Sequence, residues 1–84
     1  MKQITVYTTE PCGHCRTAKD ILAKHNLPFE EINLSKDPDG RAELARRTGL
    51  MTFPQILIGG ESLGGARELH TAAKSGRLDE LLAA

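Results

Sequence analysis

The fold is decided by residues 4–25, ITVYTTEPCGHCRTAKDILAKH, in which a strand pattern, a cysteine pair and a helix pattern follow one another. Ile4 to Thr8 alternates apolar and polar side chains, which is typical of a half-buried strand. Arg16 to His25 has the spacing of an amphipathic helix. Between them stand Cys12 and Cys15, the only cysteines of the chain. A Cys-x-x-Cys pair at a strand-to-helix junction is the sequence signature of a dithiol redox site.

The positions of the two cysteines predict different roles for them. Side chains three residues apart on a helix lie about 5–6 Å apart, within reach of a disulfide. Cys12 is expected at the first helical turn, where unpaired N–H groups and the positive end of the helix dipole favour a thiolate. We therefore predict that Cys12 is the nucleophile and that Cys15, one turn further, is the resolving thiol. A protonated His14 would stabilise the same thiolate, unless its side chain points to solvent.

Two other uses of a cysteine pair fit the sequence less well. Structural zinc takes four ligands, usually as two pairs. This chain has no second cysteine pair, and its three histidines, His14, His25 and His70, are scattered. A purely structural disulfide across so short a loop removes little entropy from the unfolded chain. We therefore expect no metal and assign the pair to redox chemistry.

Length and charge narrow the class of protein. Eighty-four residues make one small domain, residues 1–84, and leave no room for a second. The formal net charge is +0 at pH 7, so neither a nucleic acid nor a membrane is expected as a partner. The chain shows no signal peptide and no transmembrane run, and two adjacent cysteines without a signal sequence indicate a reducing compartment. We expect a cytoplasmic protein and a monomer.

The remaining residues predict an α/β fold with the element order βαβαββαα. The expected elements after the first helix are strand 29–34, helix 38–48, hairpin 55–58 and 61–63, helix 66–75 and a short helix around 78–82. Asp37 is expected to cap the second helix, and Gly49 to end it. A right-handed crossover makes the first two strands parallel, and the hairpin adds an antiparallel pair. The result is a four-stranded mixed sheet with helices on both faces.

Three features of the sequence each allow two interpretations when the residues alone are considered. Pro54 precedes a strand, where a proline either simply marks the start of an edge strand or follows a cis peptide bond in a tight turn. Gly64-Gly65 opens a helix, where such a pair forms a simple turn or cradles an anion on exposed N–H groups. Arg46 and Arg47 belong either to a solvated helix face or to a site that grips a carboxylate.

Several motifs together resemble the glutaredoxin family over essentially the whole chain. They are Cys12-Gly13-His14-Cys15, Thr52-Phe53-Pro54 before a strand, and Gly64-Gly65 at the start of the third helix. Residues 54–60, PQILIGG, and residues 76–82, GRLDELL, are similar to the bacterial branch. This resemblance implies the thioredoxin-like fold, a cis Pro54 beside the dithiol, and glutathione as the reductant.

The same resemblance implies a binding site for glutathione and substrate. The backbone of Phe53 would pair with the cysteine of glutathione, and the Gly64-Gly65 turn would receive its γ-glutamyl carboxylate. The residues implied in the site are Thr52, Phe53, Pro54, Gly64, Gly65, Ala66 and Arg67.

The chain departs from the family pattern at four places. Gly13-His14 stands where most dithiol glutaredoxins have Pro-Tyr. This dipeptide resembles protein disulfide isomerase, whose potential of about −180 mV is more oxidising than the roughly −200 to −230 mV of glutaredoxins. Thr9 and Leu50 replace basic residues, and Arg67-Glu68 replaces an Asp pair. These replaced sites normally touch the charged ends of glutathione, so we expect weaker glutathione capture.

The expected function is reduction of protein disulfides and glutathione mixed disulfides with glutathione, through a Cys12–Cys15 dithiol. Expected partners are glutathione and disulfide-containing or glutathionylated proteins, with ribonucleotide reductase as one candidate. One alternative is a redoxin that donates electrons to ribonucleotide reductase and is recharged by thioredoxin reductase. Another, from a different class, is an iron–sulfur carrier that holds a cluster between two copies of Cys12.

Overall fold

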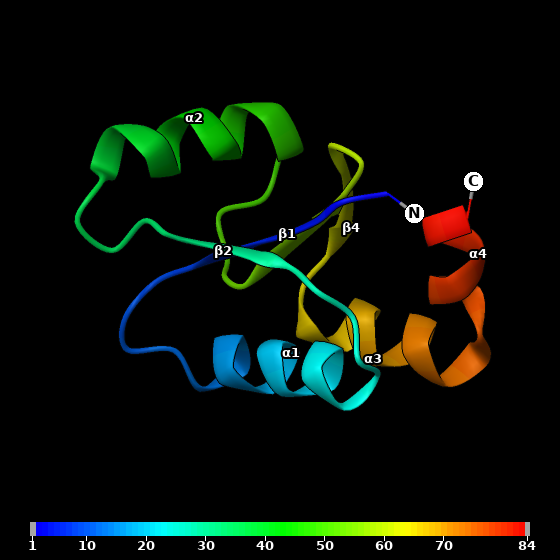
Figure 1. Ribbon diagram of the computed structural model, residues 1–84. Helices are drawn as coiled ribbons and strands as arrows, with labels where there is room; N and C mark the ends of the chain where they lie inside the picture. The colour runs from blue at the N-terminus through cyan, green and yellow to red at the C-terminus, as the bar shows by residue number, and fades with distance from the viewer. Residues whose placement is uncertain (1, 84) are drawn as a thin grey trace.

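The computed structural model describes residues 2–83, which form four strands and four helices in the predicted order (Figure 1). The elements are β1 (Ile4–Thr8), α1 (Gly13–Lys24), β2 (Glu30–Asn33), α2 (Pro38–Thr48), β3 (Gln55–Ile58), β4 (Glu61–Gly64), α3 (Ala66–Ser75) and α4 (Arg77–Ala83). None of the helices in this part of the chain is long and apolar enough to cross a membrane.

The strands form one mixed sheet in the order β2-β1-β3-β4. β1 pairs with β2 in parallel, whereas β1 with β3 and β3 with β4 pair antiparallel. Figure 1 shows α2 on one face of the sheet and α1 and α3 on the other, with α4 near the N-terminal end of β1. The predicted fold class is therefore confirmed, and β2 is an edge strand.

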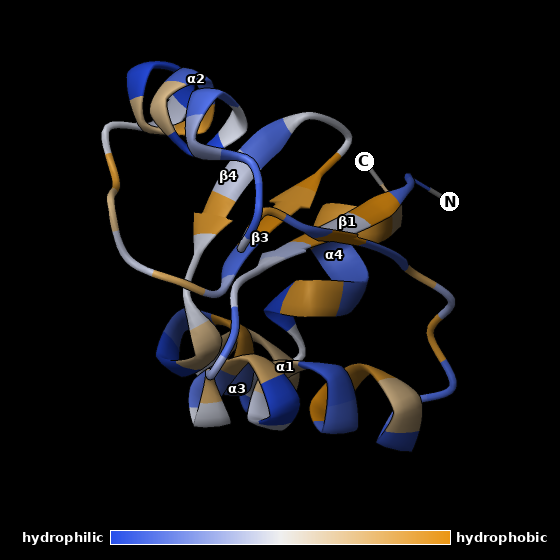
Figure 2. Ribbon diagram, turned by 90° about the vertical axis from the view of Figure 1, so that its left-hand side faces the viewer, coloured by the Kyte–Doolittle hydropathy of each residue, from blue (hydrophilic) through white to orange (hydrophobic). Residues whose placement is uncertain are grey.

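Aliphatic side chains form the core between the sheet and the α1–α3 layer. β1 contributes Ile4 and Val6, and β3 contributes Ile56 and Ile58. The helices cover them with buried side chains, which are Ala18, Leu22, Leu69, Ala72, Leu78 and Leu82. Figure 2 shows the hydrophobic colour along β3, while α2 carries many hydrophilic residues. All four residues of β3 are buried, as expected of a central strand covered on both faces.

Local signals set most helix ends as predicted. The Asp37 carboxylate accepts a hydrogen bond from the Gly40 N–H at 2.9 Å and caps α2. Gly49 ends α2 and Gly76 ends α3, both with the positive φ that glycine adopts readily. The first helix begins at Gly13 with Cys12 as its N-cap, which confirms the predicted place of Cys12 at the helix start. The helical pattern of Arg16 to His25 is thus extended toward the cysteine pair by one turn.

Two prolines follow cis peptide bonds, Glu10–Pro11 and Phe53–Pro54. The second agrees with what the glutaredoxin resemblance implies. The first was not expected from the sequence. Both bonds lie in loops at the C-terminal end of β1, next to the cysteine pair.

Candidate active site

Cys12 and Cys15 form a disulfide at the beginning of α1, with their Cα atoms 5.3 Å apart. Cys12 is the N-cap residue, with extended backbone angles, and its side chain is half-buried. Cys15 lies on the inner face of α1 and is only 3% exposed. Since a substrate disulfide can reach Cys12 more easily than Cys15, the two sulfur atoms are not equivalent.

The helix start places hydrogen-bond donors around the Cys12 sulfur. The backbone N–H of Cys15 points to Cys12 Sγ at 3.1 Å. The first turn of α1 contains no acidic residue that would repel a negative charge on Cys12. After reduction, this N–H and the positive end of the helix dipole would both stabilise a thiolate at Cys12.

The loop before β3 closes the other side of the sulfur. The carbonyl oxygen of Phe53 lies 3.8 Å from Cys12 Sγ, although 41 positions separate the two residues. Pairing of Tyr7 with Gln55 brings the end of β1 beside the start of β3, and this register places the loop there. The backbone carbonyl of Phe53 therefore lies beside the Cys12 sulfur.

The structure gathers most of the implied site residues around one groove of about 310 Å³. The groove is lined by His14, Thr52, Phe53, Pro54, Gly65, Ala66, Arg67 and Glu68. His14 is exposed and belongs to this wall. Gly64 does not line the groove, because it is buried. Its φ is +125°, a value that favours glycine. A Cβ at Gly64 would lie 2.7 Å from Glu68 Cγ, so this glycine shapes the turn.

Glu68, named from the sequence only as a departure from the family pattern, lines the groove and pairs with the double glycine. Its Oε1 accepts a hydrogen bond from the Gly65 N–H at 2.7 Å. Glu68 is the third residue of α3, and a glutamate there is the reciprocal half of a capping box. The Gly65 N–H is thus already paired, whereas the N–H groups of Ala66 and Arg67, in the first turn of α3, have no partner within the helix.

Gln55 is a second contributor that sequence reasoning missed. It is 1% exposed, and both the oxygen and the nitrogen of its side-chain amide are hydrogen-bonded. The amide oxygen accepts from the Thr48 hydroxyl at 2.8 Å, and the amide nitrogen donates to the Leu50 carbonyl at 3.0 Å. A buried polar side chain with both ends paired fixes its surroundings. Gln55 therefore positions the loop that carries Thr52 and Phe53, and the strand pattern alone gave no sign of it.

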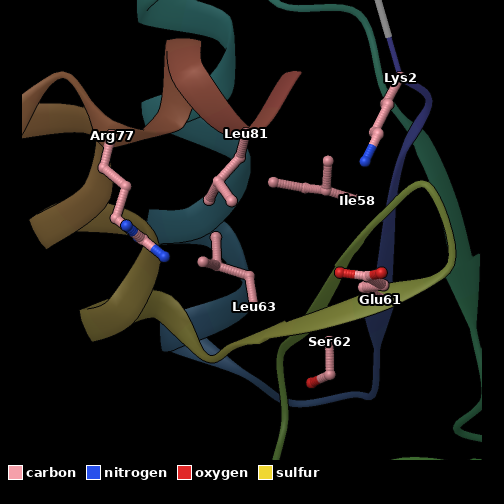
Figure 3. Close-up of a pocket in the computed structure, with 7 residues that line it drawn as sticks. All are labelled: Lys2, Ile58, Glu61, Ser62, Leu63, Arg77 and Leu81. Carbon is pink, nitrogen blue, oxygen red and sulfur yellow. The ribbon is translucent and has the colours of Figure 1, made fainter. Parts of the chain in front are cut away.

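Other predicted features lie apart from the groove. The Arg46 guanidinium pairs with Glu43 on the surface of α2. No group of three or more potential metal ligands occurs within residues 2–83. A separate hollow of about 330 Å³ is lined by Lys2, Ile58, Glu61, Ser62, Leu63, Arg77 and Leu81, as Figure 3 shows. It contains no cysteine and lies beside α4, so it does not belong to the dithiol site.

Comparison with known proteins gives one consistent result. A sequence model of the glutaredoxin family matches residues 4–63. A glutaredoxin of Pseudomonas aeruginosa is 43% identical over 84 residues and covers 100% of both chains. Glutaredoxin 3 of Escherichia coli K12 is 34% identical over 82 residues, covering 98% of this chain and 99% of the relative.

Solved structures agree with the sequence relatives. The solution structure of a glutaredoxin from Brucella melitensis has a TM-score of 0.85 and 41% identity, covering 98% of this chain and 89% of that one. The crystal structure of a buckwheat glutaredoxin–glutathione complex has a TM-score of 0.86 and 27% identity, covering 98% and 77%. The comparisons do not favour the alternative redoxin or the iron–sulfur carrier.

Proposed function

This chain belongs to the glutaredoxin family and is a thiol–disulfide oxidoreductase, and on that premise we propose the roles of its individual residues. Cys12 is the nucleophile and Cys15 the resolving thiol. The observation that carries this assignment is the difference in burial, since Cys15 is 3% exposed whereas Cys12 is half-buried, with its sulfur 3.8 Å from the Phe53 carbonyl oxygen. We also propose that residues 1–84 act as one domain, in the cytoplasm and as a monomer, without a metal.

Reduction of a protein disulfide follows from these roles in two exchanges. The Cys12 thiolate attacks one substrate sulfur, and the other sulfur leaves as a thiolate and takes up a proton. The Cys15 thiolate then attacks Cys12 Sγ and releases the first substrate sulfur. The substrate has gained two electrons, and the protein is left with the Cys12–Cys15 disulfide. Two glutathione molecules restore the dithiol and become oxidised glutathione.

Glutathione would bind in the groove beside Cys12. The Phe53 backbone would pair with its cysteine, and the N–H groups of Ala66 and Arg67 would receive its γ-glutamyl carboxylate. The buckwheat complex, whose fold matches this one, supports glutathione as the ligand. Glu68 already accepts the hydrogen bond of the Gly65 N–H and adds a negative charge to the groove. The half-buried Thr9 supplies no cation. These features support glutathione-dependent activity with a raised Michaelis constant.

The proposal is tested by two single substitutions. Cys12→Ser is expected to abolish all thiol–disulfide activity, because it removes the nucleophile. Cys15→Ser is expected to spare reduction of a glutathione mixed disulfide, which needs one thiol, and to lose reduction of protein disulfides that need resolution. Both activities are measured with glutathione, glutathione reductase and NADPH. An equal loss of both activities in the two variants would contradict the assignment.

The reductant is tested separately with the unmodified protein. Oxidised protein is incubated with glutathione plus glutathione reductase, or with thioredoxin reductase and NADPH. We expect turnover with the glutathione system. Fast turnover with thioredoxin reductase alone would instead support the role of an electron donor to ribonucleotide reductase.

A further inference from the structure

We propose that a hollow between the C-terminal halves of α1 and α3 binds a small ion that carries a diphosphate group. The hollow, called here the α1–α3 hollow, has a volume of about 320 Å³. It is lined by Ile21, Lys24, His25, His70, Ala73 and Lys74. It shares no residue with the groove beside the cysteine pair, so the inference goes beyond the proposed function and does not depend on it.

The packing of two helices creates this hollow. Figure 1 shows α1 and α3 on the same face of the sheet and running in the same general direction, so their C-terminal ends lie toward the same side of the molecule. Ile21 of α1 and Ala73 of α3 pack against the core and supply the apolar part of the lining. His70 and Lys74, four positions apart, lie on one face of α3. The fold thereby brings basic side chains from two helices to one place.

The polar part of the lining has one sign of charge. Lys24 and Lys74 each carry a positive charge, His25 and His70 are exposed imidazoles, and no acidic residue within residues 2–83 belongs to the lining. The chain as a whole has a formal net charge of +0, so its composition does not explain this cluster. Neither lysine forms an ion pair in the described part of the chain. An anion is the ligand that complements such a surface.

The helix ends do not account for the cluster. The C-terminal end of a helix carries roughly half a negative charge, so two ends offset about one of the two lysine charges. The last carbonyls of α1 also have partners already. The Ile21 carbonyl accepts from the His25 N–H at 3.2 Å, and that of Leu22 accepts from the N–H of residue 27 at 2.9 Å. His70 lies in the middle of α3, where the end effect is small. A net positive charge therefore remains for a ligand.

The number and kind of donors favour a diphosphate over smaller anions. A lysine ammonium binds phosphate oxygens as a point charge, and an imidazole offers an N–H donor even when it is neutral. Four such side chains on two helices match a ligand with several acceptor oxygens and more than one negative charge. A chloride ion or a single carboxylate would satisfy only part of them. The volume equals about ten water molecules at liquid density, which admits a diphosphate.

The first test titrates the oxidised protein with inorganic pyrophosphate at constant ionic strength and follows the backbone amide signals by NMR. We expect saturable shifts centred on residues 21–25 and 70–74. Shifts centred on residues 66–67, at the start of α3, would place the anion in the groove beside the cysteine pair and would overturn the inference. Shifts that do not saturate would overturn it as well.

The same titration with ADP distinguishes a free ion from a nucleotide. Equal or weaker binding of ADP assigns the hollow to the free ion, whereas tighter binding assigns it to a nucleoside diphosphate whose apolar part contacts Ile21 and Ala73. Saturable binding of one of the two at the hollow supports the inference. The absence of such binding with both overturns it.

Two double variants test whether the charges of the hollow, rather than the charge of the whole protein, bind the ion. Lys24→Gln with Lys74→Gln should raise the dissociation constant for pyrophosphate about five- to tenfold. Lys36→Gln with Arg47→Gln removes the same charge from exposed positions on and before α2 and should change it less than twofold. Equal weakening in both variants overturns the inference. Disulfide reduction is not part of this readout, so a negative result leaves the proposed function standing.

Discussion

His14 is the side chain near Cys12 whose effect on the dithiol can be measured directly. Its side chain is exposed at the groove two residues after Cys12. When protonated, it would favour the Cys12 thiolate and the reduced form, which makes the couple more oxidising. His14→Tyr should therefore decrease the thiolate fraction about two- to tenfold and lower the reduction potential.

Thiolate absorbance against pH and equilibration with a glutathione buffer measure these two effects. His25→Tyr is the matched control, because His25 is an exposed histidine at the other end of α1. If His14→Tyr leaves both quantities unchanged, the helix terminus alone stabilises the thiolate.

Thr9 is a position at which an added cation should strengthen glutathione binding. It directly follows β1 and is half-buried near the cysteine loop. A charged hydrogen bond typically contributes about 1.5–3 kcal/mol, which corresponds to roughly a ten- to hundredfold change in affinity. We expect Thr9→Lys to lower the Michaelis constant for glutathione about tenfold. Thr17→Lys adds the same charge on the exposed face of α1 and should have little effect; equal effects would indicate general electrostatic attraction.

At the scale of the element, the start of α3 serves both stability and binding. Glu68 pairs with the Gly65 N–H and thereby caps the helix. Glu68→Ala should lower the free energy of unfolding by about 1 kcal/mol, because the cap is lost. It should also lower the Michaelis constant for glutathione, because it frees an N–H and removes a negative charge from the groove.

Glu68→Gln keeps an acceptor oxygen but not the charge, so it separates the two effects. It should retain most of the stability and still improve glutathione binding. Urea unfolding and steady-state kinetics measure them. A Glu68→Ala protein with unchanged stability would show that the hydrogen bond does not support α3.

At the scale of the whole molecule, one carboxylate connects the edge strand, the central sheet and the first helix. Glu31 of β2 accepts a hydrogen bond from Thr8 of β1 at 2.9 Å and pairs with Lys19 of α1 at 3.2 Å. Burial raises the pKa of Glu31, but the Thr8 hydroxyl and the Lys19 ammonium together lower the pKa by more than burial raises it. The pKa of Glu31 therefore lies below its ordinary value.

A lowered carboxylate pKa makes part of the stability depend on pH. The contribution is present above the ordinary glutamate pKa and is lost as the pH falls through the lowered value, because the folded state binds the proton less readily. Glu31→Gln should therefore reduce stability at pH 7 and flatten its decline in acid. Urea unfolding between pH 3 and 7 tests this, with the neighbouring exposed Glu30→Gln as control. The same acid dependence in the Glu31→Gln and unmodified proteins would contradict it.

The sequence by itself determined the features that depend on neighbours in the chain. The strand pattern of residues 4–8, the capped start of α2 at Asp37 and its glycine end at Gly49 all appear as predicted. The Cys12–Cys15 spacing likewise determined the disulfide and the placement of Cys12 at the helix start. Side-chain periodicity and interactions between residues close in the sequence specify these features, so periodicity and capping rules are sufficient to predict them.

Only the tertiary structure decided which distant groups meet at the sulfur. The Phe53 carbonyl reaches Cys12 because β3 pairs with β1 in one register, and no local pattern specifies that register. A groove between Met51 and α2 likewise depends on packing between elements. The sequence therefore determined the redox chemistry, whereas contacts between separate elements decided the shape and charge of the surface that selects its substrates.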